Sequence, residues 1–189
     1  GALDYGFAHP LSFGVLTMGP RGDIHLLGLH HQARWYIPQH HGAMTALCDD
    51  LGVDWRQLVV HAGLDLWASR GGDEPETPAD KFVKRGWRVE RATVARVAGA
   101  RAVGERLGNP SADVAPSLFI AARAWGAFHT LARLVPDPHN AEDVRKVDAD
   151  AKARGGDDDY DMLRYGVMAM QPTAPAARPA KKPNAWKGL

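Results

Sequence analysis

The sequence has 189 residues but only one cysteine and no long hydrophobic run. Cys48 has no second cysteine with which to form an internal disulfide, so the chain suits a reducing compartment and its stability must come from packing. No apolar stretch approaches the roughly 18 to 20 residues that a membrane helix needs, and the first residues do not resemble a secretory signal. We therefore expect neither a membrane protein nor a secreted one, and any catalytic metal would be held by carboxylates and histidines.

The composition divides the chain into a body, residues 1–170, and a tail, residues 171–189. The tail carries four basic residues, no acids and four of the 13 prolines, which predicts a disordered basic segment. The body is long enough to form one domain with a substantial core. Because the sequence begins at Gly1 without Met and a candidate functional residue occurs as early as Asp4, we expect a piece of a longer protein.

The net charge of +1 conceals a strong separation of signs along the chain. Residues 142–161 hold eight of the 22 acids, which is unfavourable unless cations neutralise them. Residues 81–106 are basic instead. A solvated helical face is one interpretation of this basic segment, and a phosphate-binding surface is the other; the candidate contacts are Lys81, Lys84, Arg85, Arg88, Arg91, Arg96 and Arg101.

The periodicity of apolar residues predicts an α/β domain with a mixed sheet. Leu11–Met18 and Ile24–Leu29 flank a Gly/Pro-rich turn, as in a β-hairpin, and Pro38–Leu51 has helical spacing. The later segments alternate between the two types. We expect short strands at 57–60, 87–90 and 117–120, and helices at 78–85, 93–107, 121–134 and 158–170.

Acidic residues lie at the ends of three of these elements. Asp4 is in or just before the first strand, and Asp65 follows Gly63 after a later strand, where open α/β sheets place ligands. Asp158 and Asp161 share a face at the start of the last helix, with Asp157 beside them. Carboxylates gathered from these segments would bind Mg²⁺ or Mn²⁺, and a pair of such ions drives phosphodiester hydrolysis.

Each acid also has an ordinary explanation when it is taken alone. Asp4 could belong to a frayed terminus and Asp65 to a solvated loop, while the acids from Asp157 onward complement the positive end of a helix dipole. His61, near the second acid, is either a packed histidine or a residue that assists the site. Spacing alone does not choose between these interpretations.

Four stretches of the sequence resemble the nuclease domain of the large terminase subunit of tailed bacteriophages, the motor that packages and cuts viral DNA. They are the opening Asp4-Tyr5-Gly6, the segment from Gly63 to Arg70 with its Gly-x-Asp-x-Trp pattern, the stretch from Gly86 to Leu107 with Arg-x-x-Gly at Arg96 to Gly99, and the segment from Ala141 to Val144 followed by the closing run from Asp157 to Tyr165 with Asp-x-x-Arg-Tyr. The closing run is the most specific of the four.

This resemblance implies a ribonuclease H-like fold, with a mixed β-sheet flanked by helices, and cleavage of double-stranded DNA with two divalent metal ions. It assigns the metal ligands to Asp4, Asp65, Asp158 and Asp161, with Asp157 as the adjacent alternative. Asp4 would bridge both ions, Asp65 would hold one, and Asp158 or Asp161 the other. No side chain serves as the nucleophile in such a mechanism, because one metal activates water and the other stabilises the leaving oxygen.

The resemblance also predicts partners and a location. Double-stranded DNA, the portal and the small terminase subunit would be the partners, and the host cytoplasm the site of action. The sequence contains no Gly-x-x-x-x-Gly-Lys-Ser/Thr loop, so the ATPase of such a motor would lie outside this chain. Two alternatives stay open: another ribonuclease H-like nuclease of the resolvase or transposase type, and a non-catalytic module that binds DNA or the portal.

Overall fold

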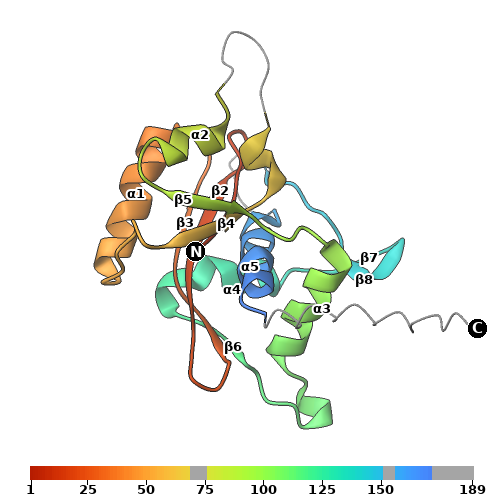
Figure 1. Ribbon diagram of the computed structural model, residues 1–189. Coiled ribbons are helices and arrows are strands. Elements are labelled where there is room, and N and C mark those ends of the chain that lie inside the picture. The colour runs from red at the N-terminus through yellow and green to blue at the C-terminus, as the bar shows by residue number, and fades with distance from the viewer. Residues whose placement is uncertain (69–75, 151–155, 172–189) are drawn as a thin grey trace, which may run out of the picture.

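The computed structural model describes residues 1–68, 76–150 and 156–171; the predicted tail from residue 172 and Arg70 of the Gly63–Arg70 motif lie outside these ranges. A six-stranded mixed sheet forms the centre of the molecule, and helices cover both of its faces (Figure 1). The strands of the sheet are β1 (Ala2–Asp4), β2 (Leu11–Met18), β3 (Ile24–Gln32), β4 (Val59–Ala62), β5 (Arg88–Arg91) and β6 (Leu118–Ile120). The α-helices are α1 (Ile37–Asp50), α2 (Pro78–Val83), α3 (Arg96–Leu107), α4 (Trp125–Leu131) and α5 (Asp158–Ala169).

The strands are arranged in the order β5-β4-β1-β2-β3-β6. β1, β2 and β3 form an antiparallel meander, while β4 and β5 run parallel to β1, and β6 runs parallel to β3. The carboxyl ends of β1, β4, β5 and β3 therefore meet at one edge of the sheet, where β2 begins. We refer to this side of the sheet as the carboxyl edge.

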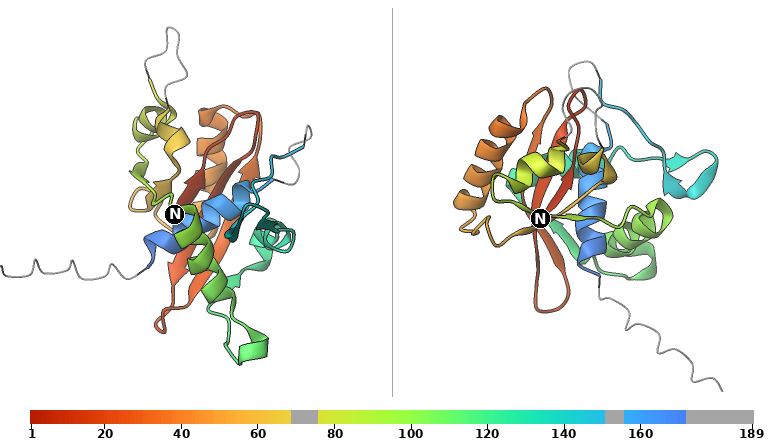
Figure 2. Two further views of the ribbon diagram at one scale, coloured as in Figure 1. Left: turned by 90° about the vertical axis from the view of Figure 1, so that its right-hand side faces the viewer. Right: turned by 45° about the horizontal axis from the view of Figure 1, so that its top comes forward.

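Alternation along the strands creates two separate cores, one on each face of the sheet. Leu3, Phe13 and Val60 belong to the core covered by α1 and α2, whereas Ala2 and Leu16 face α3, α4 and α5. Figure 2 shows the helices on the two sides of the sheet. Asp4 is two residues after Ala2, so the same alternation directs it toward α5.

The last helix is the most buried element of the fold. Every residue of α5 from Asp159 to Val167 is buried, because the helix contacts the sheet on one side and α3 and α4 on the other. Its N-terminus lies at the carboxyl edge of the sheet. Its C-terminal end lies beside Gly1 and His61, which line a common cavity with Met170.

The structure confirms the expected sheet elements and helices, with shifts at their boundaries. The strand expected at 57–60 is Val59–Ala62, because pairing with β1 and β5 selects the residues that enter the sheet. Leu107, the last residue of α3, is 47% exposed although it is apolar. The short hairpin of β7 (Pro136–Asp137) and β8 (Asn140–Val144) was not predicted, since its sequence lacks apolar alternation.

None of the helices within the described ranges has the length and apolar character needed to cross a membrane.

Candidate functional site

The acidic segments that are far apart in the sequence meet at the carboxyl edge of the sheet. Asp4 is the last residue of β1, and Asp65 lies in the 3₁₀ turn that follows β4. The third segment begins at Asp157, immediately before α5. These three segments surround a cavity of about 130 Å³, which we call the acidic cavity; its aspartates are Asp4, Asp65, Asp148, Asp157, Asp158 and Asp161.

All five predicted metal-ligand candidates therefore line one cavity. The parallel pairing of β1 and β4 brings the first two together, because parallel strands end at the same edge. Gly63 allows this close approach: a Cβ atom there would lie 3.2 Å from Oδ1 of Asp4 and 3.0 Å from the hydroxyl oxygen of Tyr165. A side chain at position 63 would therefore crowd the carboxylate of Asp4.

Asp4 is the most perturbed acid of the site. Burial first, and then the nearby charges of Asp161, Asp158 and Asp65, raise its pKa to about 8. Lys146 acts in the opposite direction. A carboxylate in this environment is unstable as an anion unless a cation compensates it.

Two other acids carry oxygens that lack partners. Oδ2 of Asp157 and Oδ2 of Asp158 are buried and make no hydrogen bond with the described residues. Burial raises the pKa of Asp158 to about 6, and burial, together with the charge of Asp161, raises the pKa of Asp157. Buried carboxylate oxygens without donors are suited to receive a cation.

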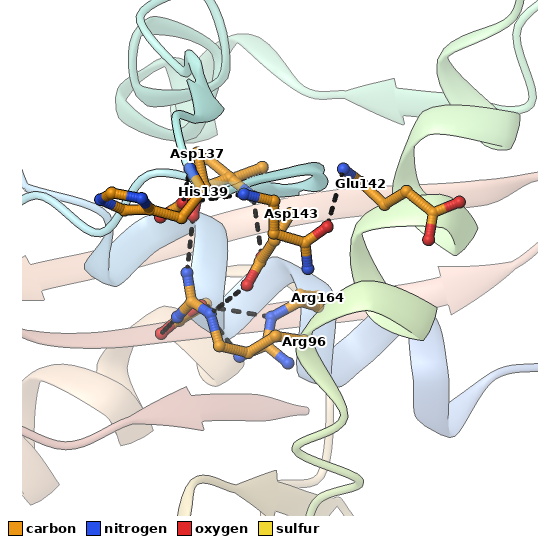
Figure 3. Close-up of polar contacts among 9 residues, drawn as sticks. Arg96, Asp137, His139, Glu142, Asp143 and Arg164 are labelled. Carbon is orange, nitrogen blue, oxygen red and sulfur yellow. Dashed lines mark hydrogen bonds and ion pairs between the residues drawn. The ribbon is translucent and has the colours of Figure 1, made fainter.

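Asp161 differs from its neighbours because arginines already compensate its charge. Oδ1 of Asp161 accepts hydrogen bonds from Nε and Nη2 of Arg164, at 3.2 Å and 2.9 Å, and Oδ2 lies 3.8 Å from Nη1 of Arg96. Arg96 also donates to Asp143 on β8 at 3.0 Å, as Figure 3 shows. The Arg-x-x-Gly and Asp-x-x-Arg-Tyr stretches are therefore parts of one ion-pair network.

Asp159 does not line the acidic cavity but belongs to a separate cavity that His31 and Thr130 also line. Its Oδ1 accepts a hydrogen bond from the hydroxyl of Ser12 at 2.6 Å and lies 2.6 Å from Nδ1 of His31. The hydroxyl of Thr130 donates to Oδ2 at 3.4 Å. These contacts attach the first turn of α5 to the sheet and to α4, so they fix the position of Asp158, the preceding residue.

Sequence reasoning did not assign His9, Lys146, Asp148 or Tyr165 to the site, although all four line the acidic cavity. Tyr165 was available as part of the Asp-x-x-Arg-Tyr stretch. Lys146 and Asp148 lie in the irregular segment between β8 and α5, where no periodicity predicts which side chains face inward. The charge of Lys146 opposes the rise in the pKa of Asp4 and Asp157, so this lysine places a cation beside the acids of the cavity.

The basic residues between 81 and 106 do not form one continuous row. Lys81, Lys84 and Arg85 belong to α2 or its end, and Arg88 and Arg91 to the edge strand β5. On α3, Arg96 pairs with Asp143 and Arg101 pairs with Glu142. His61, in turn, lines the cavity at the C-terminal end of α5 and is not part of the acidic cavity.

The donor set fits a hard divalent cation in its chemistry. Every acid named above offers carboxylate oxygens, which Mg²⁺ and Mn²⁺ prefer. The described residues nevertheless contain no group of three or more His, Cys, Asp or Glu side chains that is already close enough to hold an ion. Asp4, Asp157 and Asp158 are the best candidate ligands, because burial raises the pKa of all three and Asp157 and Asp158 each have a buried oxygen without a hydrogen-bond partner among the described residues.

Comparison with known proteins supports the fold. No protein-family model and no curated protein matches the sequence. Among solved structures, the nuclease domain of the P22 large terminase aligns with a TM-score of 0.62 and 16% identity, covering 89% of this chain and 78% of that domain. The large terminase of a thermophilic bacteriophage aligns with a TM-score of 0.60 and 16% identity, covering 87% of this chain but 38% of that protein.

These similarities confirm the mixed, ribonuclease H-like architecture that the sequence resemblance implies. The chain spans little more than a third of the large terminase from the thermophilic phage. At this level of identity the shared property is the fold.

Proposed function

We propose that this chain is the nuclease domain of a phage DNA-packaging terminase and that it cuts double-stranded DNA with divalent metal ions. The observation that carries this proposal is the acidic cavity, where aspartates from β1, the turn after β4 and the start of α5 meet. The similarity to large terminases supports the same activity. The proposal also includes the portal and the small terminase subunit as partners. It places the ATPase in another part of the protein and the action in the host cytoplasm.

The candidate ligands are Asp4, Asp65, Asp157, Asp158 and Asp161. When bound, a pair of Mg²⁺ or Mn²⁺ ions would activate a water molecule and stabilise the leaving oxygen of a phosphodiester. The charges of Asp161, Asp158 and Asp65 all act on Asp4, so these carboxylates together would hold the ions. Asp161 also has a second role, because its ion pair with Arg164 fixes its orientation at the wall of the cavity.

The residues of the chain prepare the site without providing a nucleophile. The hydrogen bonds of Asp159 to Ser12 and His31 hold the start of α5 in place. Lys146 at the rim of the cavity offers a positive charge to the phosphate that is to be cut. The basic residues from Lys81 to Arg101 remain candidate contacts to the DNA backbone, with Arg88 and Arg91 exposed and Arg96 and Arg101 paired with acids.

The test is cleavage of supercoiled plasmid with Mn²⁺ or Mg²⁺. We expect the wild-type chain to nick and linearise the plasmid and chelator to stop it. Asp4→Asn should lower the rate by at least about 100-fold, since electrostatic groups at such sites contribute this much. Asp113→Asn is the matched control, because Asp113 is exposed and its left-handed backbone, φ 55°, also suits Asn.

Metal-dependent cleavage that persists in Asp4→Asn would show that the proposed centre is wrong. A wild-type chain that binds DNA but does not cut with any of these metals would favour the non-catalytic binding module.

A further inference from the structure

A second and larger cavity adjoins the acidic cavity. Its volume is about 660 Å³, and Tyr5, the residue after Asp4, lines both cavities. Aromatic rings and cations dominate its wall, and we call it the aromatic groove; the residues that matter here are Tyr5, Phe7, Trp35, Tyr36, Lys81 and Arg85.

Contacts between neighbouring loops preform one wall of the groove. The backbone N–H of Arg34 donates to the carbonyl oxygen of Phe7 at 2.7 Å, which joins the loop after β1 to the turn after β3. Arg34 has φ 62°, a left-handed conformation that sets this turn. The turn places Tyr36 at the N-cap of α1, where its ring lies 5.4 Å from that of Phe7.

The rings of the groove are held in place but remain accessible. Tyr36 is 69% exposed, although aromatic side chains of this size normally bury most of their surface. Trp35 is half-buried, and its ring packs against those of His30 and His40 at 5.7 Å and 5.8 Å. Accessible rings on a fixed support are suited to stack on a flat ligand.

The cations of the groove come from α2 and the turn that follows it. Lys81 is in α2, and Arg85 lies in the turn just after the helix ends. Nη1 of Arg85 donates to the carbonyl oxygen of Lys81 at 2.9 Å, which restrains the guanidinium next to the end of α2. Glu76 also lines the groove, but an ion pair with Lys84 compensates its charge. The groove therefore favours an anion with flat, apolar faces.

We propose that the aromatic groove binds an unpaired segment of the DNA strand whose phosphodiester lies in the acidic cavity. The bases of this segment stack on Tyr36 and Trp35, and its phosphates contact Lys81 and Arg85. Stacking on these rings requires exposed base faces, which a closed duplex keeps inside its own stack. Since Tyr5 belongs to both cavities, a strand that leaves the acidic cavity enters the groove directly.

This inference rests on the proposed function for the position of the scissile bond, but its test does not need catalysis. Binding is measured in chelator, with a labelled single-stranded oligonucleotide of about 12 nucleotides that contains 2-aminopurine, and with the matching duplex. We expect the 2-aminopurine fluorescence to fall when the single strand binds, because stacking quenches it. Tyr36→Ala should weaken single-strand binding about tenfold and abolish the quenching. Lys81→Ala should weaken binding and reduce its salt dependence.

Two matched controls lie outside the groove. Phe119 is an aromatic residue on β6 that is 42% exposed, and Arg21 is a cation with a 90% exposed side chain in the turn between β2 and β3, at the far end of the sheet. We expect Phe119→Ala and Arg21→Ala to bind the single strand like the wild type. Thermal melting of every variant confirms that it is folded.

Several results would overturn the proposal. They are the absence of single-strand binding in chelator, unchanged quenching in Tyr36→Ala, or equal losses in Tyr36→Ala and Phe119→Ala. If Tyr36→Ala lost binding to the duplex but kept binding to the single strand, the proposal would also be overturned, because the groove would then hold paired DNA. Asp4→Asn separates this inference from the proposed function: it should stop cleavage and leave single-strand binding in chelator intact.

Discussion

Asp4 shows at the scale of one residue why the acidic cavity needs a cation. Its carboxyl group ends a strand whose other residues are buried, and it faces α5, where further acids begin. Burial and these neighbouring charges together raise its pKa from 3.8 to about 8. The folded chain therefore keeps a proton on Asp4 over a range of pH in which the unfolded chain has lost it.

This difference in proton binding predicts how stability depends on pH. Between pH 3.8 and about 8 the folded state binds one more proton than the unfolded state, so the free energy of unfolding falls as pH rises through this window. In chelator, we expect the stability of Asp4→Asn relative to the wild type to increase steadily as the pH rises through this window. Thermal melting at a series of pH values measures the difference.

The comparison needs a variant that loses an aspartate elsewhere. Asp113→Asn removes an exposed carboxylate, so a plot of its melting temperature against pH should stay parallel to that of the wild type. If the plot for Asp4→Asn were also parallel to that of the wild type, the Asp4 carboxyl group would have the same pKa in the folded and unfolded states, contrary to its burial.

The contact between α3 and α5 matters most at the scale of secondary-structure elements. Arg164 is 2% exposed, and its stem passes directly over Gly99 of α3. A Cβ atom at position 99 would lie 2.5 Å from Cγ of Arg164, closer than atoms can approach. Glycine at this position lets the two helices pack closely, and this packing directs the guanidinium of Arg164 toward Asp161.

We expect Gly99→Ala to force α3 and α5 apart and to destabilise the chain by about 1–3 kcal/mol, the range for an overpacked core. Gly104→Ala in the same helix is the control, because a Cβ atom there meets nothing within 4 Å. That variant should be stabilised by up to about 1 kcal/mol through helix propensity. Urea unfolding measures the free energy of unfolding of both variants. Equal changes in the two would contradict the close contact between Gly99 and Arg164.

The acidic cavity depends on the whole molecule, because its acids come from both ends of the chain. Asp4 and Asp158 are brought together only when β1 pairs with its neighbours and α5 packs across the sheet. An ion bound in the cavity would therefore bind the folded state and not the unfolded chain. Such binding is coupled to folding.

Mn²⁺ at about 100 times its Kd should stabilise the chain by about 2.7 kcal/mol. The melting temperature should therefore rise with Mn²⁺ concentration. Asp158→Asn should lose most of this rise, since the variant removes a carboxylate with a buried, unpartnered oxygen. Asp113→Asn should keep it. A melting temperature that does not respond to Mn²⁺ in the wild type would argue against a metal site formed by folding.

Local patterns of residues in the sequence determined a large part of this protein's structure. Alternation and helical spacing predicted the strands and helices of the sheet domain, and the resemblance to terminase nuclease domains predicted its architecture. The acids at element ends were also visible, because a charged residue beside an apolar strand stands out in the sequence. These features depend on residues that are close together along the chain.

Only the tertiary structure decided how these acids differ from one another. Asp157, Asp158, Asp159 and Asp161 look alike in the sequence, but Asp159 turns toward Ser12 and His31, while Asp161 is paired with Arg164. The aromatic groove was likewise hidden, because its rings and cations come from loops and a helix that are distant in sequence. Burial and the identity of a charge's partners depend on long-range packing, and no local pattern of residues contains that information.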